Sequence, residues 1–402
     1  MIDSERRLDV LALNSGSSSL KFGLYRVGSS SLETLVSGEA TSVGDKDSAF
    51  HAQDARGTTL RSEAIALQSQ TEAITHIGRL LAETKMPVPA VIGHRIVHGG
   101  PKLRRHCLID DLVLAQLEAA TAFAPLHLPA ALSVIRSAKE LFPGVPQVAC
   151  FDTSFHAGLP EVARVLPIPK DLQADGIQRY GFHGLSYESI LRQLGQPLPT
   201  RIVIAHLGNG ASVTAVRDGR SIDTSMGLTP SGGVIMGTRG GDLDPGVLLY
   251  LMRERKFDAA MLGDLINHRS GLLGISGVSS DMRVLRAAAS SNADAQLAID
   301  MFCISVRKQI AAMIAVLDGI DMLVFTGGIG EHDEQAREAI CSGLSWIGVS
   351  PDVARNRSVT NPISNTASRC PVLVLTAQED EQIARHSWQL LKPASSSPPV
   401  KT

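Results

Sequence analysis

Short apolar runs alternate with amphipathic stretches along most of this 402-residue chain. An apolar run closed by turn-forming residues indicates a buried strand, because a strand covered on both faces has few polar positions. Such strands are expected at residues 10–13, 91–92, 148–151, 202–207, 322–325 and 372–375. Helical spacing of apolar residues, or a high alanine content, predicts helices at residues 69–83, 112–123, 130–141, 245–255 and 293–317. This alternation predicts an α/β protein.

A pattern of three short strands occurs twice. In the first copy, the strand at 10–13 is followed by a Gly/Ser-rich loop, a strand at 20–26 and a third strand near Leu35. In the second copy, residues 202–225 repeat this order, with a Gly-rich turn after the first strand and the hairpin turn Asp218-Gly219 after the second. The chain is also longer than one hydrophobic core usually organises. We therefore expect a duplicated fold of two domains with a nucleotide cleft between them.

Three segments that follow predicted strands have the composition of phosphate-binding loops. They lie at residues 14–21, 206–210 and 326–331. Glycine lets the backbone approach an anion closely, while serine hydroxyls, a lysine amine and consecutive N–H groups donate to phosphoryl oxygens. The Walker A loop is excluded because the sequence contains no Gly-Lys pair, and the HRD, DFG and strand-linked GxGxxG signatures are missing too. Phosphate is therefore expected to be bound by another type of loop.

Composition excludes several classes of partner. The formal net charge is −2 without an extended basic stripe, so nucleic acid is not expected as a partner. Apolar runs stay well below the roughly 20 residues of a membrane-spanning helix, and the first seven residues lack the apolar segment of a secretory signal. Five scattered cysteines show no metal-ligand spacing. A cytoplasmic protein with small-molecule partners and no membrane or nucleic-acid partner is expected.

Nine motifs, in order along the chain, resemble those of the acetate kinase family. They lie at residues 13–21, 93–100, 124–127, 151–156, 180–184, 206–210, 236–242, 270–276 and 325–331. The resemblance covers nearly the whole chain. It implies an actin-like, sugar-kinase-like fold of two ribonuclease-H-like halves, in agreement with the repeat, and a homodimer. The expected domains are residues 1–155 with about 382–402, and residues 156–381.

The resemblance also implies a reaction. The γ-phosphoryl group of ATP would be transferred reversibly to acetate, giving acetyl phosphate and ADP. The reaction would use Mg²⁺ as the cofactor, or Mn²⁺ in place of Mg²⁺. Propionate or another short-chain carboxylate is the alternative acceptor. A carboxylate is already ionised at pH 7, so the difficulty is electrostatic, because an anionic nucleophile must approach an anionic phosphoryl group. A site for this reaction should be rich in cationic donors.

Residues of the matching motifs supply such donors. The resemblance implies that Arg95 binds the carboxylate, while His183 and Arg239 stabilise the transition state. Asp152 ends a predicted strand and matches the catalytic acid/base of the family. Because the acceptor arrives deprotonated, we expect Asp152 mainly to orient Arg239 or the water shell of the metal.

Further roles follow from the resemblance. The metal positions match Asn14 and Glu379. The pocket around the acceptor matches Val97, Leu126, His127, Phe182 and Pro230. Nucleotide contacts are implied at Ser17, Ser19, Lys21, His206, Leu207, Gly208, Asn209, Gly210, Asp281, Met282, Arg283, Gly328, Ile329, Gly330, Glu331 and His332.

The sequence departs from the usual family pattern at three positions. After Gly184 the family has Thr-Ser-His, whereas this chain has Leu185-Ser186-Tyr187, which alters how His183 is supported. His332 replaces the usual Asn, which leaves nucleotide preference open. A remote alternative function is an actin-like or Hsp70-like nucleotide-gated binding protein, which would hydrolyse ATP without a carboxylate. A sugar kinase is disfavoured because a hydroxyl acceptor calls for a carboxylate base.

Overall fold

The computed structural model describes residues 7–16 and 18–391 and divides the chain into two units. The first unit comprises Met1–Ser154 and Gln378–Thr402, and the second comprises Phe155–Ala377. The chain returns to the first unit at residue 378, a few residues before the expected position near residue 382. Helix α15 (Glu379–Leu391) already contacts strands of the first unit. Within the two described segments, no helix is long and apolar enough to cross a membrane.

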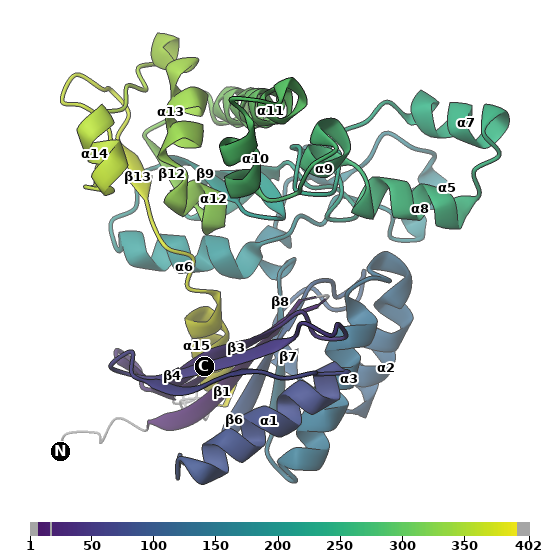
Figure 1. Ribbon diagram of the computed structural model, residues 1–402, viewed down its shortest axis with the longest axis vertical. Coiled ribbons are helices and arrows are strands. Elements are labelled where there is room, and N and C mark those ends of the chain that lie inside the picture. Colours follow the sequence, from purple (N-terminus) through teal and green to yellow (C-terminus); the bar gives the residue numbers. More distant parts are fainter. Residues whose placement is uncertain (1–6, 17, 392–402) are drawn as a thin grey trace, which may run out of the picture. The chain divides into compact units, whose positions relative to one another are not determined.

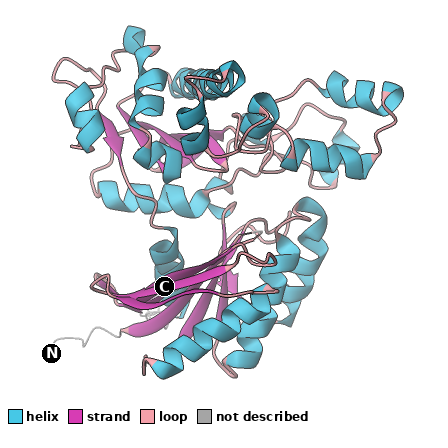
Figure 2. Cartoon of the chain, in the orientation of Figure 1, coloured by secondary structure: helices cyan, strands magenta, loops and turns pink. Residues whose placement is uncertain are grey.

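The first unit is built on an eight-stranded sheet in the order β5-β4-β3-β2-β1-β6-β8-β7 (Figures 1 and 2). Strands β1 to β5 pair antiparallel with one another in chain order. Strand β6 runs parallel to β1, and β8 runs parallel to β6. The strands are β1 (Leu8–Ser15), β2 (Leu20–Val27), β3 (Leu32–Thr41), β4 (Ala49–Asp54), β5 (Thr59–Ala64), β6 (Val91–Ile96), β7 (Cys107–Leu108) and β8 (Gln147–Phe151). The helices are α1 (Gln70–Glu83), α2 (Asp111–Ala119), α3 (Leu128–Leu141) and α15.

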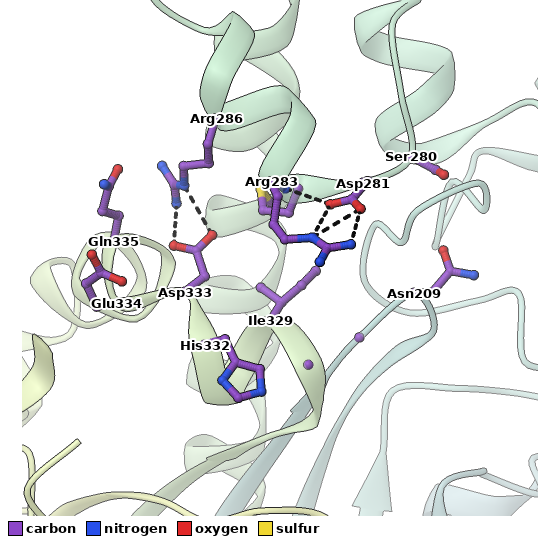
Figure 3. A pocket seen from close by; sticks show the side chains of 13 residues that line it. Asn209, Ser280, Asp281, Arg283, Arg286, Ile329, His332, Asp333, Glu334 and Gln335 are labelled. Carbon is purple, nitrogen blue, oxygen red and sulfur yellow. Dashed lines mark hydrogen bonds and ion pairs between the residues drawn. The ribbon is translucent and has the colours of Figure 1, made fainter. Parts of the chain in front are cut away.

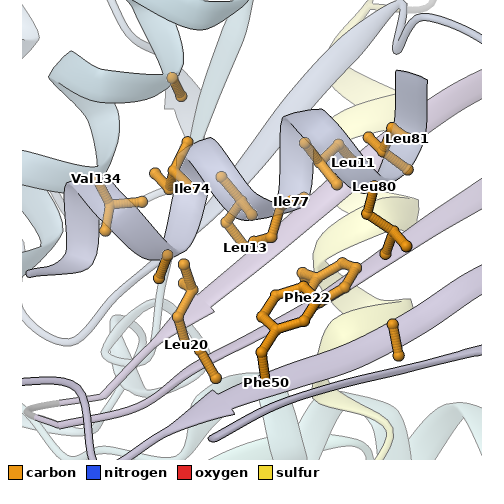
Figure 4. Packing of buried hydrophobic residues seen from close by; sticks show 14 of the residues in the cluster. Leu11, Leu13, Leu20, Phe22, Phe50, Ile74, Ile77, Leu80, Leu81 and Val134 are labelled. Carbon is orange, nitrogen blue, oxygen red and sulfur yellow. The ribbon is translucent and has the colours of Figure 1, made fainter. Parts of the chain in front are cut away.

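Helices cover both faces of this sheet. Leu11 and Leu13 of β1 pack with Ile74 and Ile77 of α1 in one apolar cluster, which Figure 4 shows from close by. Side chains alternate between the faces of a strand, so Gly93 of β6, which follows a residue of that cluster, faces the other side. A Cβ atom on Gly93 would collide with Ser387 and Ile383 of α15. Glycine at this position therefore lets α15 pack directly on the sheet.

The second unit contains a five-stranded sheet in the order β11-β10-β9-β12-β13. Its strands are β9 (Arg201–Leu207), β10 (Ala211–Arg217), β11 (Arg220–Thr224), β12 (Met322–Thr326) and β13 (Val372–Val374). Helix α11 contacts β9, β10 and β11, and α6 contacts β9. The helices are α4 (Glu161–Arg164), α5 (Lys170–Ala174), α6 (Gly184–Leu194), α7 (Pro245–Glu254), α8 (Ala259–His268), α9 (Gly271–Ser276), α10 (Met282–Ala288), α11 (Ala293–Leu317), α12 (Gly327–His332), α13 (Glu334–Ser342) and α14 (Val353–Ser358).

The two sheets share one strand order, so the predicted duplication is confirmed. In the first unit three antiparallel strands, β3-β2-β1, are followed by the parallel strands β6 and β8. In the second, β11-β10-β9 are followed by the parallel strands β12 and β13. The α/β class is confirmed with it.

Several predicted boundaries differ from the structure. The strand expected at 91–92 extends to Ile96, because His94 is paired with Gln147 in the core and continues the strand. The helix expected at 112–123 ends at Ala119 and is followed by a 3₁₀ turn. Strands β4 and β5 were not predicted, since their sequences mix apolar and charged residues at the open side of the sheet.

Candidate active site

The Gly/Ser-rich loop of the first unit is a tight hairpin between β1 and β2. Asn14 pairs directly with Lys21 across the two strands, which places both side chains on the same face. The amide of Gly16 donates to the carbonyl of Ser19 over 2.8 Å and closes the turn. Ser17, one of the predicted nucleotide contacts, lies outside the described residues. The hairpin thus presents one carboxamide and one exposed amine side by side.

An acidic pair from the start of α15 meets this hairpin. The side-chain amide of Asn14 donates to Oε2 of Glu379 over 3.1 Å and to Oδ1 of Asp380 over 2.9 Å. Burial raises the pKa of Asp380, and the neighbouring Glu379 raises it further, whereas Asn14, Lys21 and Arg95 oppose the shift. Sequence reasoning missed Asp380, although three consecutive acidic residues at a helix start were visible in the sequence.

These oxygen donors fit a hard divalent cation. Two carboxylates and a carboxamide oxygen are the ligand types that Mg²⁺ and Mn²⁺ prefer. The raised pKa of Asp380 reflects a buried carboxyl group beside another acid, which is the kind of repulsion that a cation relieves. Asn14 and Glu379 therefore lie together with Asp380 beside them, while Oδ1 of Asn14 accepts from Arg95, and the metal role of Asn14 and Glu379 stays a prediction.

Arg95 is held in place by Asp152. Nε of Arg95 donates to Oδ2 of Asp152 over 2.8 Å, and Nη2 lies 2.6 Å from the same oxygen. Nη1 donates to Oδ1 of Asn14 over 3.2 Å. Burial lowers the pKa of Arg95, but Asp152, Glu379 and Asp380 outweigh burial and raise it above its usual value. Asp152 is fully buried and contacts Arg95 of its own unit, while its expected role of orienting Arg239 or the water shell of the metal stays a prediction.

The residues predicted around the acceptor do not all belong to one unit. Val97 is buried just after β6, Leu126 is exposed, and His127 stands immediately before the first residue of α3. All three belong to the first unit, whereas Phe182 and Pro230 belong to the second.

His183 immediately precedes helix α6 as its N-cap residue and has an unusual backbone conformation. Its φ is +60°, in the left-handed region that is uncommon for residues other than glycine. Its ring stacks on His206 with 4.2 Å between ring centres and 20° between planes. Nδ1 of His183 lies 2.8 Å from Oγ of Ser212 on β10. Three elements, α6, β9 and β10, therefore fix the orientation of this imidazole.

A second buried histidine fixes the residue before His183. Nε2 of His156 lies 3.0 Å from the carbonyl oxygen of Phe182, and Nδ1 lies 2.8 Å from Oγ of Ser221. Burial lowers the pKa of His156 to about 4, so the ring is neutral at pH 7. A carbonyl only accepts hydrogen bonds, so Nε2 carries the proton and Nδ1 accepts from Ser221. Sequence reasoning assigned His156 to a matching motif but gave it no role.

Arg239 and His183 converge at Gly210, in the turn between β9 and β10. A Cβ atom placed on Gly210 would lie 3.1 Å from Nη2 of Arg239 and 3.3 Å from Nε2 of His183. Nη1 of Arg239 donates to the carbonyl oxygen of Pro230 over 2.5 Å, which leaves Nη2 directed at the turn. Two nitrogen donors thus approach the same backbone position, which a side chain in place of glycine would crowd.

A cavity of about 820 Å³ borders the other side of this turn. Figure 3 shows two ion pairs at its wall: Asp281 accepts from Arg283, and Asp333 accepts from Arg286. Its lining includes eight of the predicted nucleotide contacts and five further residues. The lining consists of Gly208, Asn209, Ser280, Asp281, Met282, Arg283, Arg286, Gly328, Ile329, His332, Asp333, Glu334 and Gln335.

The third Gly-rich segment forms the short helix α12 and not an open loop. Gly327 adopts a φ of +77°, and a Cβ atom there would lie 2.8 Å from the carbonyl oxygen of Leu207. The carboxylate of Glu331 accepts from the amides of Gly327, over 2.9 Å, and Ala377, over 3.0 Å. Buried Arg337 donates to the carbonyl oxygens of Gly330 and Glu331, both over 2.9 Å. Gly330 and Glu331 therefore support the helix whose residues Gly328, Ile329 and His332 line the cavity.

Comparison with known proteins gives concordant results. The model of the acetokinase family matches residues 9–385. The acetate kinase of Methylocella silvestris is 43% identical over 400 residues, covering 95% of this chain and 98% of that protein. The acetate kinase of Heliobacterium modesticaldum is 41% identical, with 95% and 99% covered.

Solved structures agree with this result. A propionate kinase from Francisella tularensis superimposes with a TM-score of 0.89 at 36% identity, covering 96% of this chain and 100% of that chain. The acetate kinase of Porphyromonas gingivalis gives a TM-score of 0.85 at 36% identity, with the same coverage.

Proposed function

Because this chain belongs to the acetokinase family, we propose that it transfers the γ-phosphoryl group of ATP reversibly to acetate, giving acetyl phosphate and ADP. The observation that carries this proposal is the turn between β9 and β10. Gly208 and Asn209 line the cavity, while Gly210 faces His183 and Arg239. A nucleotide bound in the cavity with its phosphates at this turn has two donors directed at the group to be transferred.

The acceptor is bound by Arg95. Its guanidinium is matched to a carboxylate, and Asp152 fixes its orientation through contacts at Nε and Nη2. Asp152 is already bonded to a cation, and acetate carries no proton at pH 7, so Asp152 acts as a positioning residue and not as a base. One acetate oxygen forms the new bond to the γ-phosphorus, and the bond between this phosphorus and the bridging oxygen breaks.

Charge accumulates on the equatorial oxygens of the transferred group and on the leaving ADP. His183 and Arg239 donate to these oxygens. A divalent cation, Mg²⁺ or Mn²⁺, would be held by Asn14 and Glu379 with Asp380 beside them, and would neutralise phosphate charge when bound. Lys21, opposite Asn14 in the hairpin, adds a further cationic donor.

The choice between acetate and propionate depends on how side chains pack around the alkyl end of the acceptor. One methylene changes discrimination by only about 1–3 kcal/mol. The positions that match the acceptor pocket of the family, Val97, Leu126, Phe182 and Pro230, are all apolar, and their residue types do not separate a methyl from an ethyl group, so propionate is the alternative acceptor. Steady-state comparison of kcat/KM for acetate and propionate decides between them.

The experiment that tests the function traps the product. ATP, MgCl₂ and acetate are incubated with the protein and hydroxylamine, and acetohydroxamate is measured through its coloured iron complex. We expect hydroxamate to form only when ATP, metal and carboxylate are all present. An ATPase activity that persists without a carboxylate, together with no hydroxamate from acetate, propionate or butyrate, would favour the nucleotide-gated binding protein and overturn the proposal.

We also propose a cytoplasmic homodimer. Helices α7 and α8 bury none of their side chains, and Leu249, Tyr250 and Met252 of α7 are each about half exposed. Such an apolar surface favours association with a second copy. The described cysteines form no disulfide with one another, in keeping with a reducing compartment. Light scattering should give twice the 42.7 kDa chain mass, and Tyr250→Glu should shift it towards the monomer.

A further inference from the structure

Three buried polar groups form a chain that ends on His183. The hydroxyl of Tyr187 lies 2.5 Å from Oγ of Ser212, and Oγ of Ser212 lies 2.8 Å from Nδ1 of His183. Tyr187 and Ser212 are fully buried, and His183 is 8% exposed. Tyr187 follows His183 by one helical turn on α6, and Ser212 reaches both from β10. The contacts therefore come from two elements that the core holds together.

The order of donors in this chain follows from chemistry. A phenol is more acidic than an aliphatic hydroxyl and is the better donor. Burial raises the pKa of Tyr187 to about 12, so its proton is retained throughout the working pH range. When Tyr187 donates to Oγ of Ser212, the hydroxyl of Ser212 is directed to Nδ1 of His183 as an acceptor. Nδ1 then carries no proton, and the proton of the neutral ring lies on Nε2.

We propose that Tyr187 is a positioning residue that, through Ser212, fixes His183 as the tautomer with its proton on Nε2. This inference rests on the proposed phosphoryl transfer for its consequence in catalysis. It assigns a task to a position at which the chain departs from the usual family sequence.

The tautomer matters because of what Nε2 faces. Nε2 and Nη2 of Arg239 both approach Gly210, at the turn that borders the nucleotide cavity. Phosphoryl oxygens only accept hydrogen bonds, so Nε2 contributes only when it carries a proton. The opposite tautomer would direct a lone pair at an anionic oxygen. A neutral ring with a fixed proton is a donor already oriented before the charge develops.

The surroundings of His183 keep its ring from rotating. His206 stacks on one face, and its own Nδ1 lies 2.8 Å from Oγ of Ser186. The ring of Tyr187 packs edge-on against His156, with 5.6 Å between ring centres. Because these contacts hold the rings, removing the phenol oxygen alone changes the proton on His183 more than its position.

The test uses variants that separate the hydroxyl from the ring. Tyr187→Phe retains the packing, Ser212→Ala removes the middle group, and the double variant removes both. We expect Tyr187→Phe to lower kcat about tenfold, the factor expected for one hydrogen bond of about 1.4 kcal/mol, with KM values for ATP and acetate within about twofold. If Tyr187 acts through Ser212, the double variant has the kcat of Ser212→Ala alone. Independent, multiplying effects would overturn the proposal.

Tyr180→Phe is the matched control. Tyr180 is also buried in the second unit, and its hydroxyl donates to the carbonyl oxygen of Gly176 over 2.9 Å. Its removal costs a comparable hydrogen bond without contact to Ser212, so thermal stability falls while kcat stays unchanged. An equal fall of kcat in this control would mean that any lost buried hydroxyl lowers activity, and the proposal would be wrong.

The tautomer of His183 can be measured directly in the absence of substrate. In protein labelled with ¹⁵N-histidine, two-bond ¹H–¹⁵N correlations report which ring nitrogen is protonated, and His183→Gln identifies the signals of His183. We expect Nε2–H in the wild type and a mixture of tautomers in Tyr187→Phe, while the signals of His156 stay in place. An unchanged tautomer in Tyr187→Phe overturns the proposal. If no carboxylate yields hydroxamate with the wild type, the proposed function fails and this measurement still decides the proposed tautomer.

Discussion

Replacing Arg239 by alanine should lower kcat by a factor of about 10³ to 10⁵, the range that arginine donors contribute to phosphoryl transfer. The physical reason is the geometry at Gly210, where Nη2 is directed at the turn while Nη1 is anchored on Pro230. Charge develops on the transferred group only in the transition state, so the loss should fall on kcat and much less on the KM for ATP. Initial rates of hydroxamate formation over a range of ATP and acetate concentrations measure both constants.

Arg239→Lys is the variant that separates charge from shape. One ammonium nitrogen cannot contact Pro230 and point at the turn simultaneously as the guanidinium does. We expect only partial recovery, on the order of 10-fold over Arg239→Ala, because the charge returns without its anchored geometry. Arg253→Ala, on the exposed helix α7, serves as control for a lost arginine. An Arg239→Ala enzyme that retained a tenth of the wild-type kcat would contradict the assignment.

Much of the fold could be predicted from local pattern alone. The repeat of three strands with a Gly-rich turn is a property of contiguous residues, and helix α11 was predicted with its observed bounds of Ala293–Leu317. Strands β4 and β5 were not predicted because each mixes charged and apolar residues. These strands are defined by pairing with neighbouring strands and not by apolar content. The end of a helix such as α2 depends on the backbone conformation of a single residue, which composition does not predict.

The candidate site shows a similar division between local and tertiary information. The positions of the motifs predicted Asn14, Glu379, Arg95 and His183 as site residues. Their catalytic and binding roles remain predictions. What each carboxylate contacts was not visible in the sequence. Asp152 holds Arg95 because β6 and β8 are parallel neighbours. Glu331 accepts from two backbone amides of its own unit, and its predicted contact with the nucleotide stays a prediction.

The support of His183 is the clearest case of information that only packing supplies. Ser212 and Tyr187 lie 25 residues apart in sequence and meet only because α6 packs against β9, the neighbour of β10 in the sheet. Sequence reasoning noticed the tyrosine as a departure and could say no more than that the support of His183 changes. The contact with Ser212 turns that departure into a hypothesis about one proton.

Arg95→Met should both abolish activity and destabilise the first unit. Removing one member of a buried ion pair leaves the other charge uncompensated, which costs about 3–5 kcal/mol in the free energy of unfolding. Asp152 is fully buried and loses both of its contacts with the guanidinium. The carboxylate acceptor loses its cation in the same variant, so hydroxamate formation should fall by a factor of about 10³ or more. Urea unfolding and the trapping assay measure the two effects separately.

The double variant Arg95→Met/Asp152→Asn distinguishes the two contributions, because a neutral amide replaces the uncompensated charge. We expect it to regain most of the lost stability while remaining inactive, since the cation for the acceptor is still missing. The matched control is Arg26→Met. Arg26 contacts Asp9 over 2.9 Å in the same unit, but its side chain is 38% exposed, and an exposed pair is worth at most about 1 kcal/mol. Recovery of activity along with stability in the double variant would show that Arg95 serves the fold and not the acceptor, and the assignment of the carboxylate site would have to be given up.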